Sequence, residues 1–390
     1  MSHTGNFNYP TSVRFGAGRI SELALACKEL GIESPLIVTD PGVANLPMLE
    51  QILSQLGEAG LTVGVFQGVR GNPTGENVDE GVQAYAHGGH DGVVGLGGGS
   101  PLDVAKAVAL MAGQTGDLFD YEDIGDNWTH VDPAGIAPHI AVPTTSGTGS
   151  EVGRASVITQ VSERDSSHHS KKIIFHPGML PPKVICDPAL TLGLPKHLTA
   201  ACGMDALSHN LEAYCAPGFH PMADGIALEG MRLVHQSLRK AVSDGSDIAA
   251  RSDMMAASMM GATAFQKGLG AMHAMAHPIG ATLDAHHGLL NAILMPYVLA
   301  FNERAVAERL GRAAAYMGIG STFTDYLNWV LSLREDVGIA HTLEAVGVTR
   351  GHIQGLALAA SQDAAAGGNP IKVGPAEFEE LLTNALLGRL

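Results

Sequence analysis

Two pairs of side chains in the second half of the chain have the types and spacing of metal ligands. Asp205 and His209 lie four residues apart in "GMDALSHNLEAY", and His273 and His277 repeat that spacing in "MHAMAHP". Residues four apart share one face of a helix, so both members of a pair can reach a single ion. For either pair alone the alternative is an ordinary polar contact on a helix, and the two pairs together favour a metal.

His286 and His287 follow shortly after the second pair, just before Gly288. Their side chains point to different sides of the chain, so we expect at most one of the two to bind the ion. One carboxylate with up to three imidazoles suits Fe²⁺, Zn²⁺ or Ni²⁺, whereas Ca²⁺ and Mg²⁺ prefer oxygen ligands. The spacing alone leaves open which three imidazoles ligate.

A glycine-rich turn in "DGVVGLGGGSPLDVAK" offers a second kind of chemistry. Its backbone N–H groups can approach a ligand without a Cβ in the way, and its glycines are Gly97, Gly98 and Gly99. We expect Ser100 to cap the following helix, with Pro101 at the first helical position and Asp103 completing a capping box. The helix N-terminus is then a site for a pyrophosphate. The alternative is a tight turn that binds no ligand.

Polar side chains follow two other predicted strands. "PTTSGTGSE" offers the hydroxyl groups of Thr144, Thr145 and Thr148, and Asp40 ends "LIVTD". Nucleotides lie at the carboxyl ends of parallel strands, and a carboxylate there accepts hydrogen bonds from a ribose diol and repels a 2′-phosphate. The pattern favours NAD over NADP. An ordinary Ser/Thr loop and a helix-capping Asp40 are the alternatives.

The elements that position these residues change in kind near residue 188. Before it, short apolar runs alternate with amphipathic stretches, which predicts a doubly wound, mostly parallel sheet. The predicted strands are 35–40, 61–66, 91–97, 139–143 and 183–188, and the predicted surface loops are 115–137 and 160–171. Later residues have helical periodicity. We therefore predict an α/β dinucleotide-binding domain at 1–188 and an all-helical metal-binding domain at 189–390.

Composition excludes several kinds of partner. A chain of 390 residues is long enough for two domains, and its formal net charge of −16 disfavours nucleic acid or an anionic membrane surface. We see no signal peptide and no apolar run long enough to span a membrane. Four cysteines without a CxxC pair indicate a reducing compartment. We expect a cytoplasmic protein that acts on a small molecule.

Four linked motifs resemble the iron-containing (group III) alcohol dehydrogenases. They are "GGGSPLDVAK", "PTTSGTGSEV", "GMDALSHNLEAY" and "HAMAHPIGATLDAHHG", in that order, and the resemblance covers nearly the whole chain. It implies NAD(P) bound by an N-terminal α/β domain and one divalent metal bound by a helical C-terminal domain. This architecture also serves dehydroquinate-synthase-like enzymes.

The resemblance assigns roles residue by residue. The implied metal ligands are Asp205, His209, His273 and His287. His277 matches a nearby histidine that does not usually ligate, and His286 matches no functional position. The implied cofactor contacts are Gly98, Gly99, Ser100, Thr144, Thr145, Thr148, Lys172 and, for NAD preference, Asp40.

Three positions depart from the family pattern, namely Gly153, Lys267 and Ile371. They bear on substrate identity and not on reaction class. Lys267 raises one specific hypothesis, because an ammonium group facing the substrate would pair with the carboxylate of a semialdehyde or ω-hydroxy acid. The alternative is a surface lysine.

We expect an NAD-dependent, metal-dependent alcohol dehydrogenase. It would interconvert a small primary alcohol, diol or ω-hydroxy acid and its aldehyde by hydride transfer. By resemblance the metal is Fe²⁺, with Zn²⁺ also compatible, and the assembly is a homodimer or larger. His277 is a candidate proton relay, with structural support of the ligands as its alternative role. The rival functions are a dehydroquinate-synthase-like lyase and a non-catalytic metal- or nucleotide-binding protein.

Overall fold

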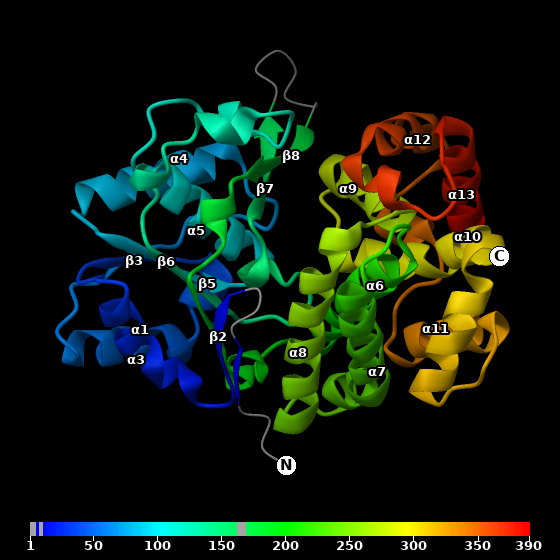
Figure 1. The fold of residues 1–390 in the computed structure, drawn as a ribbon, viewed down its shortest axis with the longest axis horizontal. Helices are drawn as coiled ribbons and strands as arrows, with labels where there is room; N and C mark the ends of the chain where they lie inside the picture. Colours follow the sequence, from blue (N-terminus) through cyan, green and yellow to red (C-terminus); the bar gives the residue numbers. More distant parts are fainter. Residues whose placement is uncertain (1–4, 8–10, 162–168) are drawn as a thin grey trace. The chain divides into compact units, whose positions relative to one another are not determined.

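The computed structural model describes residues 5–7, 11–161 and 169–390. By its contacts the chain divides into two compact units (Figure 1). Unit 1 comprises Met1–Thr145 and Gly149–Leu192, and unit 2 comprises Ser146–Thr148 and Gly193–Leu390. The assignment of separate functions to domains 1–188 and 189–390 stays a prediction.

Unit 1 is built on a seven-stranded sheet with the order β1-β2-β9-β6-β5-β3-β4. All neighbouring strands are parallel except β1 and β2. The strands are β1 (Gly5–Phe7), β2 (Ser12–Phe15), β3 (Pro35–Val38), β4 (Gly64–Phe66), β5 (Gly92–Gly97), β6 (His139–Pro143) and β9 (Lys183–Cys186). Every residue of β3, β5 and β6 is buried, which explains their continuous apolar runs. The five predicted strands are confirmed, and β1 and β2 were not predicted.

Helices cover both faces of this sheet (Figure 1). α1 (Leu23–Glu29) and α3 (Pro47–Glu58) pack on the face that Ile37 and Val94 present. α4 (Gly75–His87) and α5 (Gly99–Met111) share the opposite core with Val38 and Val93. Successive strand residues point to opposite faces, so each strand supplies both cores. The arrangement confirms the predicted doubly wound fold.

One predicted loop is wrong. β7 (Ala155–Val161) and β8 (His169–Phe175) form a two-stranded antiparallel sheet, so the described ends of the predicted loop 160–171 are strand residues. Residues 162–168 lie outside the described part. Ile158 and Ile174 are fully buried in the core beneath α5, and they hold the two strands to the rest of unit 1. The other predicted loop, 115–137, contains three short 3-10 helices: η2 (Leu118–Tyr121), η3 (Asn127–His130) and η4 (Pro133–Gly135).

The predicted capping of α5 is also wrong. The N-cap is Gly98, and no side chain caps the helix. Ser100 already lies inside the helix, where its hydroxyl donates to the carbonyl of Gly71 at 2.6 Å. The carboxylate of Asp103 accepts from Oγ of Ser150 at 2.5 Å and from the N–H of Val157 at 3.0 Å. The two side chains tie α5 to neighbouring segments of unit 1. Neither of them caps the first N–H groups of the helix, which lie at the glycine turn.

In residues 193–390, all of which the structure describes, every element is a helix. The α-helices are α6 (Lys196–Cys215), α7 (Pro221–Ser243), α8 (Ile248–Ala264), α9 (Ala271–Leu283), α10 (His287–Met317), α11 (Phe323–Asp336), α12 (Ile353–Gln362) and α13 (Pro375–Leu387). α6 is central, because α7, α8 and α10 pack against it and every residue from Thr199 to Tyr214 is buried. None of the helices in the described part is long and apolar enough to cross a membrane.

Candidate functional site

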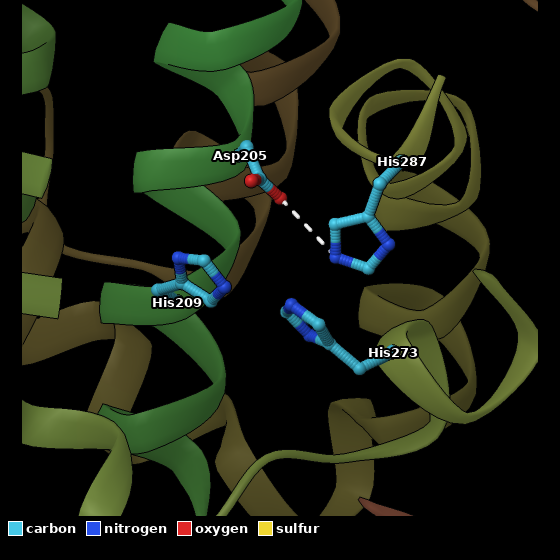
Figure 2. Close-up of side chains that lie close together, drawn as sticks. All are labelled: Asp205, His209, His273 and His287. Atoms are coloured by element: carbon cyan, nitrogen blue, oxygen red, sulfur yellow. Dashed lines mark ion pairs between the residues drawn. The ribbon is translucent and has the colours of Figure 1, made fainter. Parts of the chain in front are cut away.

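Four side chains from three helices of unit 2 converge on one point. α6 supplies Asp205 and His209 one turn apart, α9 supplies His273, and His287 is the first residue of α10. Figure 2 shows the four side chains pointing toward one another, and each offers a ligand atom within 4.8 Å of the others. Asp205, His209 and His273 are buried. The structure therefore brings together the four residues that the resemblance implied, and their binding of a metal stays a prediction.

The hydrogen bonds of two imidazoles leave their inner nitrogen atoms available. Nδ1 of His209 lies 3.2 Å from the carbonyl oxygen of Gly147, and Nδ1 of His273 lies 2.7 Å from a carboxylate oxygen of Glu212. The carbonyl of Gly147 and the ionised carboxylate of Glu212 accept from Nδ1, which places the proton there and leaves Nε2 its lone pair. Burial holds the pKa of His273 well below its usual value. The neutral imidazole is the form that binds a metal, so this donor set fits a borderline divalent ion.

Glu212 is a buried residue of this site that the sequence analysis did not identify. Besides His273, its carboxylate accepts from the N–H groups of Gly270 and Met272, each at 2.8 Å. Burial raises the pKa of Glu212 to about 7, although these N–H groups act in the opposite direction. The only signal in the sequence was its place in "SHNLEAY", one helical turn after His209. Glu212 orients His273 and sets which nitrogen of its ring carries the proton.

The start of α9 is held by side chains from distant segments. Its N-cap, Gly270, has no side chain, and the free N–H groups of the first turn go to Glu212 and to Asn369. Asn369 accepts from Ala271 at 3.2 Å and exchanges two hydrogen bonds of 2.9 Å with Asn302. A carboxylate at a helix N-terminus is electrostatically favourable. These contacts position the turn of α9 that carries His273.

His277 lies beside the four candidate ligands and has a carboxylate partner of its own. Its Nδ1 is 2.8 Å from Oδ2 of Asp363, and its ring stacks on His287 with a centroid distance of 5.4 Å. The carboxylate accepts, so Nδ1 donates and Nε2 is the free nitrogen. His286 is the N-cap of α10 and accepts from the N–H of Leu289 at 3.4 Å. Asp363 was not identified from the sequence, and the structure gives His286 a capping contact.

The predicted cofactor residues of unit 1 gather at the carboxyl ends of β3 and β5. Gly97 has a φ of +150°, and a Cβ there would lie 2.6 Å from Pro101 and 3.3 Å from Oδ2 of Asp40. A Cβ on Gly98 would lie 3.3 Å from the side chain of Thr145. Asp40 and Thr145 therefore flank the glycine turn. Asp40 also caps α2 (Pro41–Ala44) by accepting from Val43 at 3.0 Å, so the capping alternative is confirmed while its contact with NAD stays a prediction.

Two other predicted cofactor residues lie elsewhere. Lys172 is on β8, where its ammonium group pairs with Glu122 at 3.0 Å. Thr148 groups with unit 2, whereas Thr144 and Thr145 group with unit 1. The contacts of Lys172 and Thr148 with NAD stay predictions.

Lys267 is neither a surface lysine nor a free cation. Its side chain is 2% exposed, its Nζ lies 2.6 Å from Oδ1 of Asp224, and it also donates to the carbonyl of Tyr214 at 3.4 Å. Arg309 pairs with the other oxygen of Asp224. Because this ammonium group is already neutralised inside unit 2, the geometry gives no support to a role in binding a substrate carboxylate.

Comparisons with known proteins identify the same family over both halves of the chain. Residues 10–188 match "Iron-containing alcohol dehydrogenase", and residues 199–386 match "Fe-containing alcohol dehydrogenase family, C-terminal". The 4-hydroxybutyrate dehydrogenase of Cupriavidus necator is 39% identical over 97% of this chain and 99% of that protein. The NAD-dependent methanol dehydrogenase of Bacillus methanolicus is 34% identical over 98% of this chain and 100% of that protein. A crystal structure of 1,3-propanediol oxidoreductase is 35% identical with a TM-score of 0.91, covering 99% of this chain and 100% of that one.

We expect Glu212→Gln to weaken metal binding about 10- to 100-fold, the usual effect of removing a carboxylate behind a histidine ligand. Glu212→Leu should in addition lower the free energy of unfolding by about 1–3 kcal/mol, because it leaves buried N–H groups of α9 unpaired. Competition of metal-stripped protein with a chelator for Zn²⁺ measures the first effect, and urea unfolding measures the second. Glu308→Gln is the control, since that side chain is 88% exposed. Wild-type Zn²⁺ affinity in Glu212→Gln would contradict the positioning role.

Proposed function

From the premise that the chain belongs to the iron-containing alcohol dehydrogenase family, we propose that it oxidises small primary alcohols, diols or ω-hydroxy acids to aldehydes. It is an oxidoreductase that acts on CH–OH groups with NAD and a divalent metal. The observation that carries the proposal is the convergence of one carboxylate and three imidazoles in unit 2. The proposed metal ligands are Asp205, His209, His273 and His287.

A divalent ion held by these residues supplies a Lewis acid that polarises the oxygen of the alcohol or aldehyde. Family membership favours Fe²⁺, and the mixed nitrogen and oxygen donors also suit Zn²⁺. The protein's own contribution is to present unprotonated nitrogen atoms. Gly147 and Glu212 do so for His209 and His273 by accepting a hydrogen bond from Nδ1–H, which leaves Nε2 unprotonated.

In unit 1 we assign NAD to the turn that follows β5. The free N–H groups at the start of α5 and the positive end of its dipole suit a pyrophosphate. The carboxylate of Asp40 suits the ribose diol and opposes a 2′-phosphate. Further proposed contacts are Gly97, Gly98, Gly99, Ser100, Thr144, Thr145, Thr148 and Lys172. The hydride passes to the nicotinamide, whose chemistry belongs to the cofactor.

We assign proton transfer to His277, with Asp363 as its positioning residue. Donation from Nδ1 to Asp363 leaves Nε2 to take a proton that the substrate releases. The side chain of His277 is 19% exposed, so its ring also reaches solvent. Structural support of His287 through ring stacking is the alternative role.

The similarity to a 4-hydroxybutyrate dehydrogenase makes an ω-hydroxy acid a specific candidate substrate, and its semialdehyde the substrate of the reverse reaction. If the substrate is an acid, the geometry points away from Lys267 as the group that binds its carboxylate. A lyase and a non-catalytic protein, the rival functions, are disfavoured by family membership. Cytoplasmic location and assembly into a homodimer or larger stay predictions.

Replacing a single candidate ligand should remove the metal without unfolding the protein. We expect Asp205→Asn and His209→Ala to lose most bound metal. Their kcat/KM should fall at least about 100-fold, because the reaction depends on the metal as a Lewis acid. NAD affinity and the far-ultraviolet circular dichroism should stay near wild type. His286→Ala is the matched control, because His286 is next to the candidate ligand His287 in the chain but caps α10 and is not a candidate ligand. Metal analysis and NADH formation over a panel of alcohols measure these effects, and full metal content in both ligand variants would refute the site.

His277→Ala should keep its metal and lose about 100-fold or more in kcat, the usual contribution of a proton-transfer group. Imidazole added to the assay should restore part of the rate, because it can enter the space of the missing ring and carry the proton. Asp363→Asn should lose less, since it removes only the carboxylate that orients the ring. Unchanged kcat in His277→Ala, or a loss that imidazole does not relieve, would favour the supporting role.

Lys267→Met should leave substrate preference unchanged. We expect the ratio of kcat/KM for 4-hydroxybutyrate to that for 1-butanol to stay within about twofold of wild type, because the ammonium group is engaged inside the protein. A ratio that falls tenfold would restore the carboxylate-binding role.

Variants of Lys267 and of its partner Asp224 should differ in stability. Asp224→Asn leaves two cations without their carboxylate and should lose about 3–5 kcal/mol, whereas Lys267→Met leaves Asp224 paired with Arg309 and should lose less.

A further inference from the structure

Asn291 lies one turn after His287 in α10, and its side chain reaches into the group of candidate ligands. Its Nδ2 lies 2.8 Å from Oδ1 of Asp205, 3.1 Å from Nε2 of His273 and 3.1 Å from Nε2 of His287. The residue is 0% exposed. A single amide nitrogen therefore contacts three of the four side chains that are proposed to hold the metal.

The oxygen atom of this amide indicates how the Asn291 side chain is oriented. Within the described part of the chain, Oδ1 of Asn291 is buried and has no hydrogen-bond partner. Turning the amide round would set Oδ1 against the carboxylate of Asp205 and the unprotonated Nε2 of His273, so the N–H groups face the ligands. An unpaired buried carbonyl costs about 1–3 kcal/mol, and the neighbouring Leu290 and Ala292 are apolar and fully buried. The donor contacts to the ligands must offset that cost.

The three acceptors differ in what they can share with an ion. An unprotonated imidazole nitrogen has one lone pair, so Nε2 of His273 or His287 accepts a hydrogen bond or binds a metal, but not both. A carboxylate oxygen has two lone pairs, so Oδ1 of Asp205 can serve Asn291 and a metal together. Metal binding must therefore end the contacts of Asn291 with the imidazoles and can preserve its contact with Asp205.

We propose that Asn291 is a positioning residue that holds the ligands together in the metal-free protein and competes with the ion for two imidazole lone pairs. The inference rests on the proposed metal site. Its consequence is an asymmetry between two states: without the ion the two N–H groups of Asn291 are shared among three side chains, whereas with the ion only the contact with Asp205 can remain. Removing the donor raises the free energy of the metal-free state more than that of the loaded state, and the metal then binds more tightly.

The test compares Asn291→Leu with wild type. Leucine has a similar size, donates no hydrogen bond and leaves little room for a water molecule that could replace the amide. We expect metal-stripped Asn291→Leu to bind Zn²⁺ about tenfold more tightly in competition with a chelator, the equivalent of about one hydrogen bond. Its Tm should fall more without Zn²⁺ than with saturating Zn²⁺. Asn291→Ala serves if the leucine variant does not fold, and it should shift both quantities in the same direction.

Asn210→Ala is the matched control for Asn291→Ala. Asn210 is also 0% exposed with an unpaired Oδ1, but its Nδ2 donates to the backbone carbonyls of Ala206 and Ala257. It should lower the Tm equally with and without Zn²⁺ and leave the Zn²⁺ affinity unchanged. Zn²⁺ binding by the Asn291 variants that is unchanged or weaker overturns this inference alone. Wild-type protein that takes up no Zn²⁺ overturns the proposed metal site and the inference together.

Discussion

Burial of polar groups around α6 is the constraint on which the rest of unit 2 depends. Every residue from Thr199 to Tyr214 is buried, so this helix has no solvent face along most of its length, yet it carries Asp205, His209 and Glu212, each at most 6% exposed. A buried polar group that finds no partner costs several times what a formed hydrogen bond contributes. Partners from other segments are Gly147 for His209, the first turn of α9 for Glu212, and Asn291 for Asp205, which also accepts from Ser208 within α6. The hydrogen bonds that pair the buried polar side chains of α6 are therefore also the contacts that build the site.

The same pairing sets the charge of the site. Acceptors at Nδ1 direct Nε2 of His209 and His273 inward, and the carboxylates of the site are those of Asp205 and Glu212. Burial raises the pKa of Glu212 to about 7, because an isolated carboxylate in this interior has too little positive charge nearby. Two carboxylates match the charge of one divalent ion, and a nearby cation favours the ionised form of both.

Sequence patterns identified the features that depend on local spacing and missed those that depend on distant partners. The helical spacing of Asp205 and His209 and the apolar runs of the buried strands were sufficient for those predictions. Spacing alone could not choose among the later histidines, since only the fold shows that His287 begins α10 facing α6 while His286 caps that helix. Glu212 went unnoticed because the N–H groups and the imidazole that it pairs with lie 58 to 61 residues away along the chain, and Asn291 because its carboxylate partner, Asp205, lies 86 residues away. β7 and β8 were missed because polar residues interrupt their apolar pattern, among them Ser156 and Thr159 in β7 and Lys171 and Lys172 in β8.

Lys267 illustrates why a charge that departs from a family pattern need not meet the substrate. Its ammonium group lies at the C-terminal end of α6, where it donates to the carbonyl of Tyr214, and it pairs with Asp224, 43 residues away in the chain. These contacts anchor η8 (Phe265–Lys267) to α6 and α7. The first residue of η8, Phe265, lies against the ring of His209 with a centroid distance of 5.2 Å. A substitution at Lys267 would therefore act on the site through the packing of Phe265 on His209, and its effect on turnover would be the same for charged and neutral alcohols.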